Sequence, residues 1–103
     1  MPIATVSVHE LAAILTADPS TPLIDVRELD EFNQVHVPSA VHIPLQTVPL
    51  RHLELPTDRT VYVICAVGGR SAQACAWLDQ QGYDVVNVEG GTRDWVAAGL
   101  PTG

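Results

Sequence analysis

The fold of this chain is decided by residues 60–71, which read TVYVICAVGGRS. Residues 60–64 are β-branched or aromatic throughout, a composition that predicts a buried strand. The Gly-Gly pair that follows predicts a tight loop. An Ala-rich stretch then favours a helix over 71–81, and Gly82 stands where such a helix would end. This segment therefore predicts a strand, a short loop and a helix in succession.

The same alternation extends outward in both directions. In chain order, the other expected elements are an edge strand at 3–6, a helix at 7–16, a strand at 23–26, a helical turn from about 28, a short strand at 40–43, a helical segment at 46–53, a strand at 85–88 and a helix at 92–98. The first helix is marked by Ser7 and Glu10, which are spaced as a capping box. Strands that alternate with helices predict an α/β fold with a mainly parallel central sheet of about five short strands and helices on both faces.

Length and charge limit the classes of protein. The chain has 103 residues, which suits a single domain over 1–103, and its 47% hydrophobic content suits a globular core. The formal net charge is −7, and the five basic residues are scattered arginines. Such a chain lacks the basic stripe of a nucleic-acid binder and is repelled by anionic membranes. With no recognisable signal peptide or membrane-spanning stretch, we expect a cytoplasmic protein that binds neither nucleic acid nor membrane.

The two cysteines, Cys65 and Cys75, have no zinc-like spacing and suit a reducing compartment. Cys65 is the candidate nucleophile because it ends the clearest strand and opens the Gly-Gly loop. Only the thiolate is nucleophilic, and it is favoured by backbone N–H groups, a helix N-terminus and a nearby guanidinium. Glycines allow the loop to turn its amides inward. The residues expected to cradle an anion there are Ala66, Val67, Gly68, Gly69, Arg70 and Ser71.

With these residues in view, the chain resembles a single-domain rhodanese over essentially its whole length. Residues 65–71 match the active-site loop C-x-x-G-x-R-S, and residues 23–32 resemble the family's first motif. Residues 36–44 resemble its G-H-I-P-G-A-x-x-I-P stretch, although Val35 and Ser39 replace two glycines. Glu89-Gly90-Gly91, Trp95 and residues 99–101 match the C-terminal signature, and Gly90, Gly91 and Trp95 are expected to shape the pocket wall or the packing behind it.

The resemblance implies a sulfurtransferase. Cys65 would take the sulfane sulfur of thiosulfate, a persulfide or a polysulfide, and the resulting persulfide would pass it to cyanide, a thiol or sulfite. Covalent catalysis in two half-reactions predicts ping-pong kinetics. The resemblance also implies that no metal or organic cofactor takes part. The partners would be a small sulfur donor and a thiol or cyanide acceptor, or else a protein that donates or accepts sulfur.

Three residues are expected to support this site. Asp25 and Arg27 end the strand at 23–26, and Glu31 follows in the next turn, so we expect a charge pair among these three residues that holds the first loop. The resemblance implies that Arg70 supports the loop structurally, and we expect Arg70→Ala to lower transfer activity.

Several alternatives stay open. Four residues separate Cys65 from Arg70, whereas cysteine phosphatases have five, so a phosphatase or arsenate reductase is the weaker interpretation. A carrier that exchanges sulfur only with proteins would use the same residues. The apolar pair Ala66-Val67 and the net charge favour small persulfides or a protein donor over thiosulfate.

Cys75 and the histidines also have two interpretations. Cys75 is expected to be a core thiol, and the alternative is a disulfide with Cys65. A Cys–His dyad would need one of the four histidines to reach Cys65, and we consider it the weaker interpretation.

Overall fold

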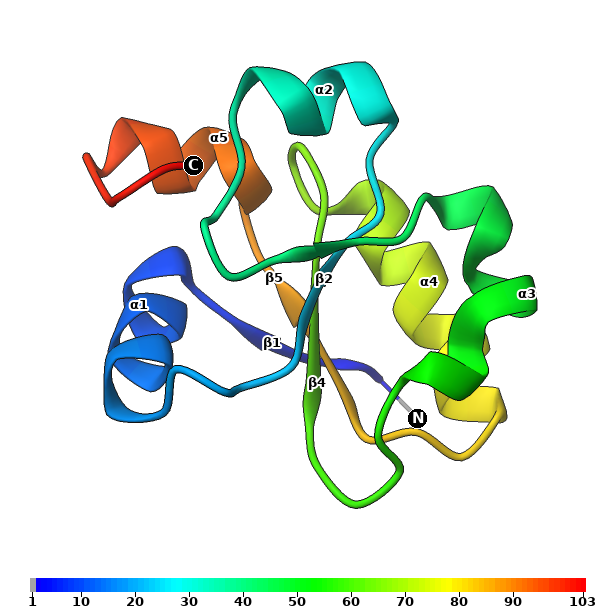
Figure 1. The fold of residues 1–103 in the computed structure, drawn as a ribbon. Coiled ribbons are helices and arrows are strands. Elements are labelled where there is room, and N and C mark those ends of the chain that lie inside the picture. The colour runs from blue at the N-terminus through cyan, green and yellow to red at the C-terminus, as the bar shows by residue number, and fades with distance from the viewer. Residues whose placement is uncertain (1) are drawn as a thin grey trace.

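The computed structural model describes residues 2–103, so Met1, the first residue of the expected domain, lies outside the described residues. The structure contains one five-stranded sheet in the order β1-β5-β4-β2-β3, with every neighbouring pair parallel (Figure 1). The strands are β1 (Ala4–Val6), β2 (Leu23–Asp25), β3 (Val41–His42), β4 (Val61–Ile64) and β5 (Val85–Val88). The expected parallel α/β fold is thus confirmed, and each expected strand is present within one or two residues of its expected bounds.

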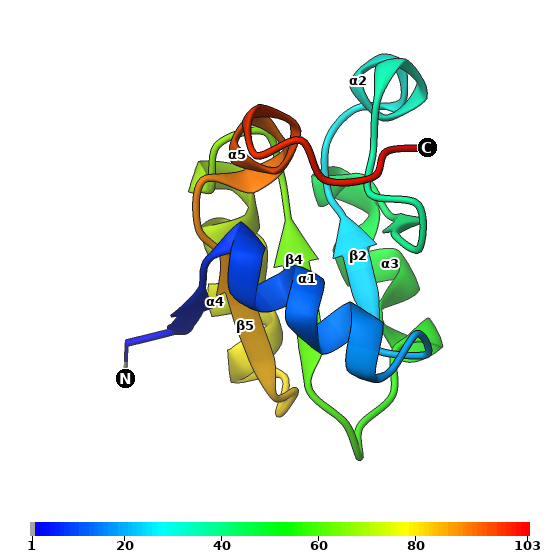
Figure 2. The same cartoon turned by 90° about the vertical axis from the view of Figure 1, so that its left-hand side faces the viewer.

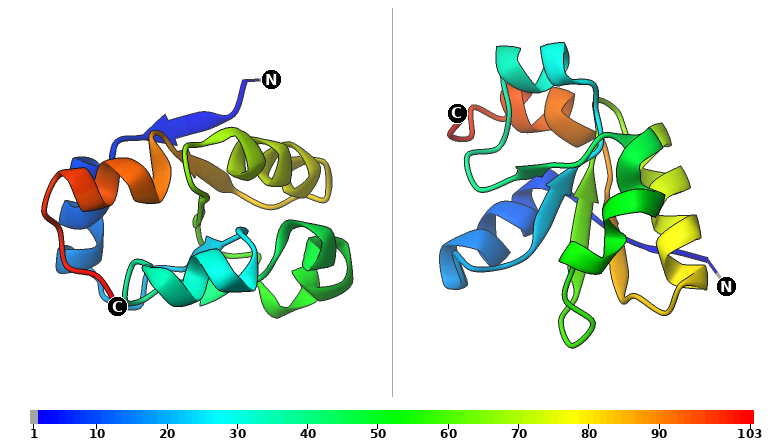
Figure 3. Two further views of the ribbon diagram at one scale, coloured as in Figure 1. Left: turned by 90° about the horizontal axis from the view of Figure 1, so that it is seen from above. Right: turned by 45° about the vertical axis from the view of Figure 1, so that its right-hand side comes forward.

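Helices cover both faces of the sheet and its carboxyl end. They are α1 (Val8–Ala17), α2 (Leu29–Gln34), α3 (Val48–Arg51), α4 (Gly69–Gln80) and α5 (Gly91–Ala97). Helix α1 crosses one face, while α3 and α4 lie behind the sheet (Figure 2). Viewed from above, α2 and α5 lie near the end of β4 (Figure 3).

Two expected helices differ from their predicted form. The segment expected as a helix at 46–53 is divided into a 3₁₀ turn at Leu45–Thr47, the short α3 and a second 3₁₀ turn at His52–Glu54. Its interior Pro49 has no N–H to donate, which limits a continuous helix. Helix α4 begins two residues earlier than expected, at Gly69. The capping box of α1 is confirmed, because Glu10 N–H donates to Ser7 Oγ and Ser7 N–H donates to Glu10 Oε1.

The sheet separates two hydrophobic cores. Strand residues alternate between its faces, so Val61 and Val63 of β4 enter one core and Ile64 enters the other. The first core includes Cys75 and Leu78 of α4, and the second contains Leu11 of α1 and Trp95 of α5. Burial of both faces explains why the strands read as continuous apolar runs.

Strand register brings the ends of three strands to one level. Asp25 of β2 lies beside Ile64 of β4, and Val63 lies beside Asn87 of β5. The residues that follow β2 and β4 therefore leave the sheet next to each other. In parallel sheets this carboxyl edge is where ligands bind.

Candidate active site at the end of β4

Cys65 follows the last residue of β4 directly and has only 1% of its surface exposed. Two groups donate hydrogen bonds to its sulfur: Gly68 N–H at 3.0 Å and the Ser71 hydroxyl at 3.2 Å. Both donors come from the loop and first turn of α4 that the sequence singled out. The expected cradle therefore closes around Sγ, with Gly68 and Ser71 as its donors.

The loop owes its shape to Gly68. This residue has a φ of +113° and occupies the N-cap position of α4, a conformation that side chains with a Cβ rarely adopt. The turn directs the Gly68 amide toward the sulfur and starts a helix of 12 residues beside it. The partial positive charge at the helix N-terminus adds to the stabilisation of a thiolate.

The Ser71 hydroxyl is fully buried and is held from β5. Its Oγ lies 2.5 Å from Asn87 Oδ1 and 3.2 Å from the Gly68 carbonyl oxygen, while Asn87 Nδ2 donates to the same carbonyl at 3.3 Å. Asn87 was missed by the sequence reasoning. A polar residue in the otherwise all-valine strand Val85–Val88 was the signal that would have found it.

These contacts favour the thiolate form of Cys65. Burial raises the pKa of the Cys65 thiol, but hydrogen bonds from the Ser71 side chain and from the backbone amides of Ser71, Gly68 and Val67 together lower it below its ordinary value. Arg70, the expected cationic neighbour, makes no hydrogen bond to the sulfur within the described residues. Backbone and hydroxyl donors therefore account for the lowered pKa.

Helix α5 fixes the other side of the loop. Thr92 donates to the Cys65 carbonyl oxygen through its N–H at 2.8 Å and its hydroxyl at 3.1 Å, and Arg93 N–H donates to the Ala66 carbonyl oxygen at 3.0 Å. Gly91 approaches so closely that an added Cβ would lie 2.4 Å from the Cys65 carbonyl oxygen. Thr92 and Arg93 were not among the expected site residues, because neither belongs to a recognisable motif.

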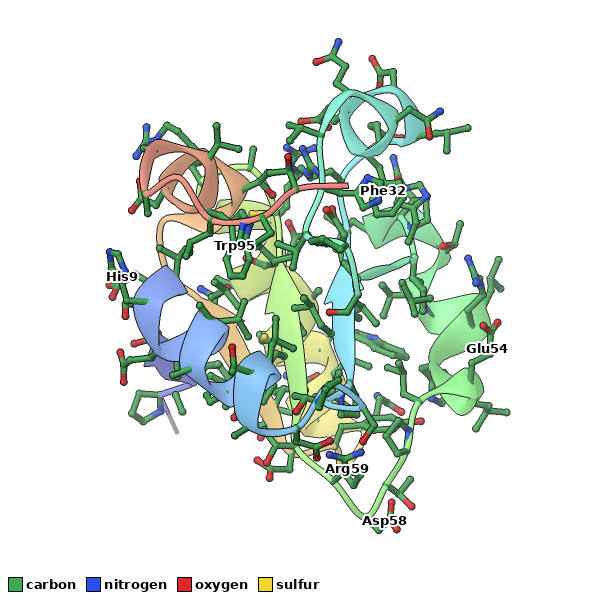
Figure 4. The ribbon with its side chains drawn as sticks, turned by 60° about the vertical axis from the view of Figure 1, so that its left-hand side comes forward. His9, Phe32, Glu54, Asp58, Arg59 and Trp95 are labelled. Atoms are coloured by element: carbon green, nitrogen blue, oxygen red, sulfur yellow. The ribbon has the colours of Figure 1, made fainter. Side chains whose placement is uncertain are left out.

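The buried Trp95 packs on the same side, in the second core, and its Nε1–H donates to the Pro101 carbonyl oxygen at 2.7 Å (Figure 4). Gly91 and Trp95 thus lie behind the loop, as the sequence indicated. The loop rests on α5 through main-chain contacts that leave little room for any side chain at position 91.

Arg70 ties α4 to α2. Its guanidinium donates two hydrogen bonds to the Glu31 carboxylate, at 2.7 and 2.9 Å. The Arg70 hydrogen bonds, helped by the Glu28 amide and by the charges of Arg70 and Arg27, lower the pKa of Glu31 to about 2 although burial opposes this shift. Both side chains are about one-third exposed, so the pair lies at the rim of the site.

The expected charge pair of the first loop forms between Asp25 and Arg27. Arg27 binds the fully buried Asp25 carboxylate through Nε and Nη2, at distances of 2.8 to 3.1 Å. Its remaining contacts are main-chain carbonyls, with the Val35 oxygen at 2.7 Å and the Glu31 oxygen at 3.4 Å. The Glu31 carboxylate pairs with Arg70 of α4, although the charge of Arg27 also contributes to its lowered pKa.

Cys75 is a core thiol, as the sequence favoured. It is fully buried in α4, burial raises its pKa to about 12, and both cysteines are free. The Cys–His dyad is wrong for this structure. Three histidine side chains have other hydrogen-bond partners: the Phe32 carbonyl oxygen for His36, the Arg27 carbonyl oxygen for His42 and the Tyr83 hydroxyl for His52. None of the hydrogen bonds among residues 2–103 joins a histidine to Cys65.

Among the described residues, no three His, Cys, Asp or Glu side chains converge as metal ligands. No helix in that part of the chain combines the length and the apolar character needed to cross a membrane.

Fold and site together define a class: a parallel α/β protein with a buried cysteine at the end of a central strand, inside an amide-lined loop that leads into a helix. Comparison with known families places the chain within that class. The Rhodanese-like domain matches residues 7–98, so the chain belongs to the rhodanese family and the resemblance read from its motifs is confirmed.

Relatives and a solved structure agree with this assignment. A sulfurtransferase of Allochromatium vinosum is 45% identical over 80 residues, which cover 77% of this chain and 75% of the relative. The thiosulfate sulfurtransferase GlpE of Tolumonas auensis is 32% identical over 91 residues, covering 87% of this chain and 85% of that protein. A rhodanese-related protein of Thermoplasma volcanium has the same fold, with a TM-score of 0.89, 31% identity and 97% of both chains covered.

Proposed function

We propose that this protein is a sulfurtransferase that carries a sulfane sulfur on Cys65. The observation that supports this most directly is the position of the sulfur: buried at the end of β4, it accepts hydrogen bonds from Gly68 N–H and the Ser71 hydroxyl. The same donors that favour a thiolate would hold an anionic persulfide. Relatives named as sulfurtransferases match this chain over more than three-quarters of its length.

The first half-reaction loads the cysteine. The Cys65 thiolate attacks the outer sulfur of the donor, and a new S–S bond forms at Sγ. The S–S bond inside the donor breaks, and its electron pair leaves with the remainder, as sulfite from thiosulfate or as a thiolate from an organic persulfide. The product is Cys65 persulfide, and no separate oxidant or reductant is needed because the sulfane sulfur moves between sulfur atoms.

The second half-reaction restores the free Cys65 thiolate. A nucleophilic acceptor such as cyanide, sulfite or a thiolate attacks the outer sulfur of the persulfide. The Cys65 thiolate then leaves with the electron pair of the broken bond. The lowered pKa of Cys65 serves both steps, because it provides the nucleophile in the first and a better leaving group in the second.

The roles of the surrounding residues follow from their contacts. Gly68 and Ser71 stabilise charge on sulfur, and Arg70, Glu31, Asp25 and Arg27 are positioning residues that hold the loops on either side of it. Ala66, Val67 and Gly69 form the remainder of the cradle.

Intact-mass spectrometry after incubation with thiosulfate or an organic persulfide tests this function. We expect the wild-type protein to gain one sulfur atom and to lose it on addition of cyanide. Cys65→Ser should gain none, whereas Cys75→Ala, a matched loss of a buried thiol, should gain as much as the wild type. No gain with any small donor would contradict the small-molecule enzyme and favour a carrier that exchanges sulfur only with a protein partner.

A further inference from the structure

A hollow of about 290 Å³ opens beside the Cys65 loop, between that loop, the end of α2 and α5. Its lining residues are Arg27, Val35, Ala66, Thr92, Arg93 and Val96. Ala66 follows Cys65 directly, so the hollow begins one residue from the nucleophile. Its volume is near the lower end of the range for small-molecule sites.

Two kinds of group line this hollow. Val35, Ala66 and Val96 give apolar walls, and Val96 is 47% exposed. Arg27 and Arg93 supply the guanidinium groups. The Thr92 hydroxyl already donates to the Cys65 carbonyl oxygen, so it is less available to a ligand.

Arg93 differs from the other four arginines. Arg27, Arg51, Arg59 and Arg70 each donate hydrogen bonds to a carboxylate, namely Asp25, Glu54, Asp18 and Glu31 respectively. Within residues 2–103, Arg93 is the arginine whose guanidinium donates no hydrogen bond, and its nearest carboxylate oxygen, Asp94 Oδ1, lies 3.7 Å from Nε. This loose ion pair with Asp94 leaves the hydrogen-bond donors of the Arg93 guanidinium available to a ligand, in a chain whose net charge is −7.

The main chain holds Arg93 next to the nucleophile. Its N–H donates to the Ala66 carbonyl oxygen at 3.0 Å, while its side chain is 71% exposed. The backbone position is thus fixed against the loop while the guanidinium stays accessible. Arg27, by contrast, is buried with its charge balanced by Asp25.

We propose that this hollow binds the organic part of the sulfur donor, and that Arg93 binds its carboxylate. The donor class is a low-molecular-weight thiol persulfide that carries a carboxylate close to its sulfurs. The carbon chain lies against Val96 and Ala66, and the departing thiolate is released from the hollow. This inference rests on the proposed sulfurtransferase function and adds the substrate class to it. Thiosulfate has no carbon chain to contact the apolar walls.

Two donors of matched size separate the charge from the reaction. The persulfides of 3-mercaptopropionate and 3-mercaptopropanamide differ only in a carboxylate and a neutral amide, and both carry the same reacting sulfurs. The measured quantity is the ratio of kcat/KM for the first donor to kcat/KM for the second. In Arg93→Gln we expect this ratio to fall about fivefold, mainly through KM, as for loss of a partly exposed ion pair. Arg93→Lys should retain most of the ratio because it keeps the charge.

Arg59→Gln is the matched control. It removes the same charge at the opposite end of the molecule from α2, which carries Phe32 (Figure 4). The ratio should keep its wild-type value there. A structural role for Arg93 would lower kcat/KM for both donors and leave their ratio unchanged, which would overturn the proposal.

Two further outcomes are informative. An equal loss in Arg93→Gln with thiosulfate and with 3-mercaptopropionate persulfide would contradict the carboxylate subsite, because it would assign Arg93 to anions in general. Sulfur loading of wild-type Cys65 by both organic donors, with no change of ratio in Arg93→Gln, would overturn this inference alone. Failure of wild-type Cys65 to load at all would overturn the proposed function together with it.

Discussion

At the scale of the residue, the reactivity of Cys65 depends on a buried hydroxyl whose position is set by another strand. Ser71 Oγ lies 3.2 Å from the Cys65 sulfur and 2.5 Å from Asn87 Oδ1. A hydroxyl has one proton, and these two atoms and the Gly68 carbonyl oxygen are all within its reach. When Cys65 is ionised, the negative sulfur attracts that proton more strongly than a neutral amide oxygen does, because hydrogen bonds to charged acceptors are stronger.

We expect Ser71→Ala to raise the pKa of the Cys65 thiol. The substitution removes the side-chain hydrogen bond that lowers this pKa most. Rates of alkylation by iodoacetamide, measured against pH, report the thiolate fraction directly. At pH 7 the rate should fall about fivefold, because one lost hydrogen bond to a charged group costs on the order of 1 kcal/mol or more. Ser39→Ala, in the turn before β3, should alkylate as the wild type does, and an unshifted profile in Ser71→Ala would contradict the role of this hydroxyl.

Residue-level features divide into those that motifs reveal and those that only the fold reveals. Cys65, Gly68 and Ser71 stand in one short loop, and their spacing alone predicted a thiolate cradle. Asn87 and Arg93 lie 22 and 28 residues downstream of Cys65, and they reach the loop through strand register and helix contact that local patterns do not encode. The valines on either side of Asn87 mark it as a polar residue in a buried strand, whereas nothing in the sequence around Arg93 indicates a site residue.

At the scale of elements, the site is an assembly of α2, α4 and α5 around the end of β4. The Arg70–Glu31 pair is the link between α2 and α4. The sequence predicted a supporting role for both residues but not that they bind each other, because they are 39 residues apart in the chain. The order of the strands in the sheet explains the Arg70–Glu31 contact, since β2 and β4 are neighbours and bring the helices that follow them together.

This link makes stability depend on pH in the acid range. The Glu31 pKa is lowered to about 2 from an ordinary 4.5, so its contribution is fully present above pH 4.5 and is lost as the pH falls toward 2. We expect the free energy of unfolding of the wild type to exceed that of Glu31→Gln by about 1 kcal/mol or less at pH 6, with this difference narrowing at pH 3 and closing toward pH 2. Urea denaturation of both proteins at several pH values measures this difference in the free energy of unfolding.

The same variants test the positioning role of the link. Arg70→Ala and Glu31→Gln should both lower sulfur transfer, and the double variant should be no worse than Arg70→Ala, because the two residues act as one unit. Arg70→Lys keeps the charge without the two-point geometry and should be intermediate. A gap in stability that stays constant from pH 6 to pH 3, or additive losses of activity, would contradict the link.

At the scale of the whole molecule, the sheet divides the interior into two layers that contribute separately to stability. The sequence predicted this architecture because each strand is short and apolar on both faces, as buried parallel strands are. It did not predict the divided helix at 46–53, where Pro49 and packing against the sheet decide the backbone. The sequence also did not predict the order of the strands in the sheet, because local patterns do not indicate which strands are neighbours.

Paired core substitutions test the independence of the layers. Leu11 in one core and Leu78 in the other are both fully buried, so Leu11→Ala and Leu78→Ala should each lower the free energy of unfolding by about 2–5 kcal/mol. In the double variant the losses should add to within about 0.5 kcal/mol. The exposed Leu53 provides the control, since Leu53→Ala should change stability by less than about 0.5 kcal/mol. Strong coupling between Leu11 and Leu78 would show that the cores are not separate.

The contact between Gly91 and the Cys65 loop has a consequence for protein engineering. The loop of residues 65–71 is continuous in sequence, yet its carbonyl groups are fixed by Thr92 and Arg93, and Gly91 leaves them the space they need. Grafting the seven-residue loop onto another α/β scaffold would therefore transfer the nucleophile without its support. The transplantable unit is discontinuous: it consists of the loop, Asn87 of β5 and the first turn of α5, and a recipient scaffold has to present all three at the same edge of its sheet.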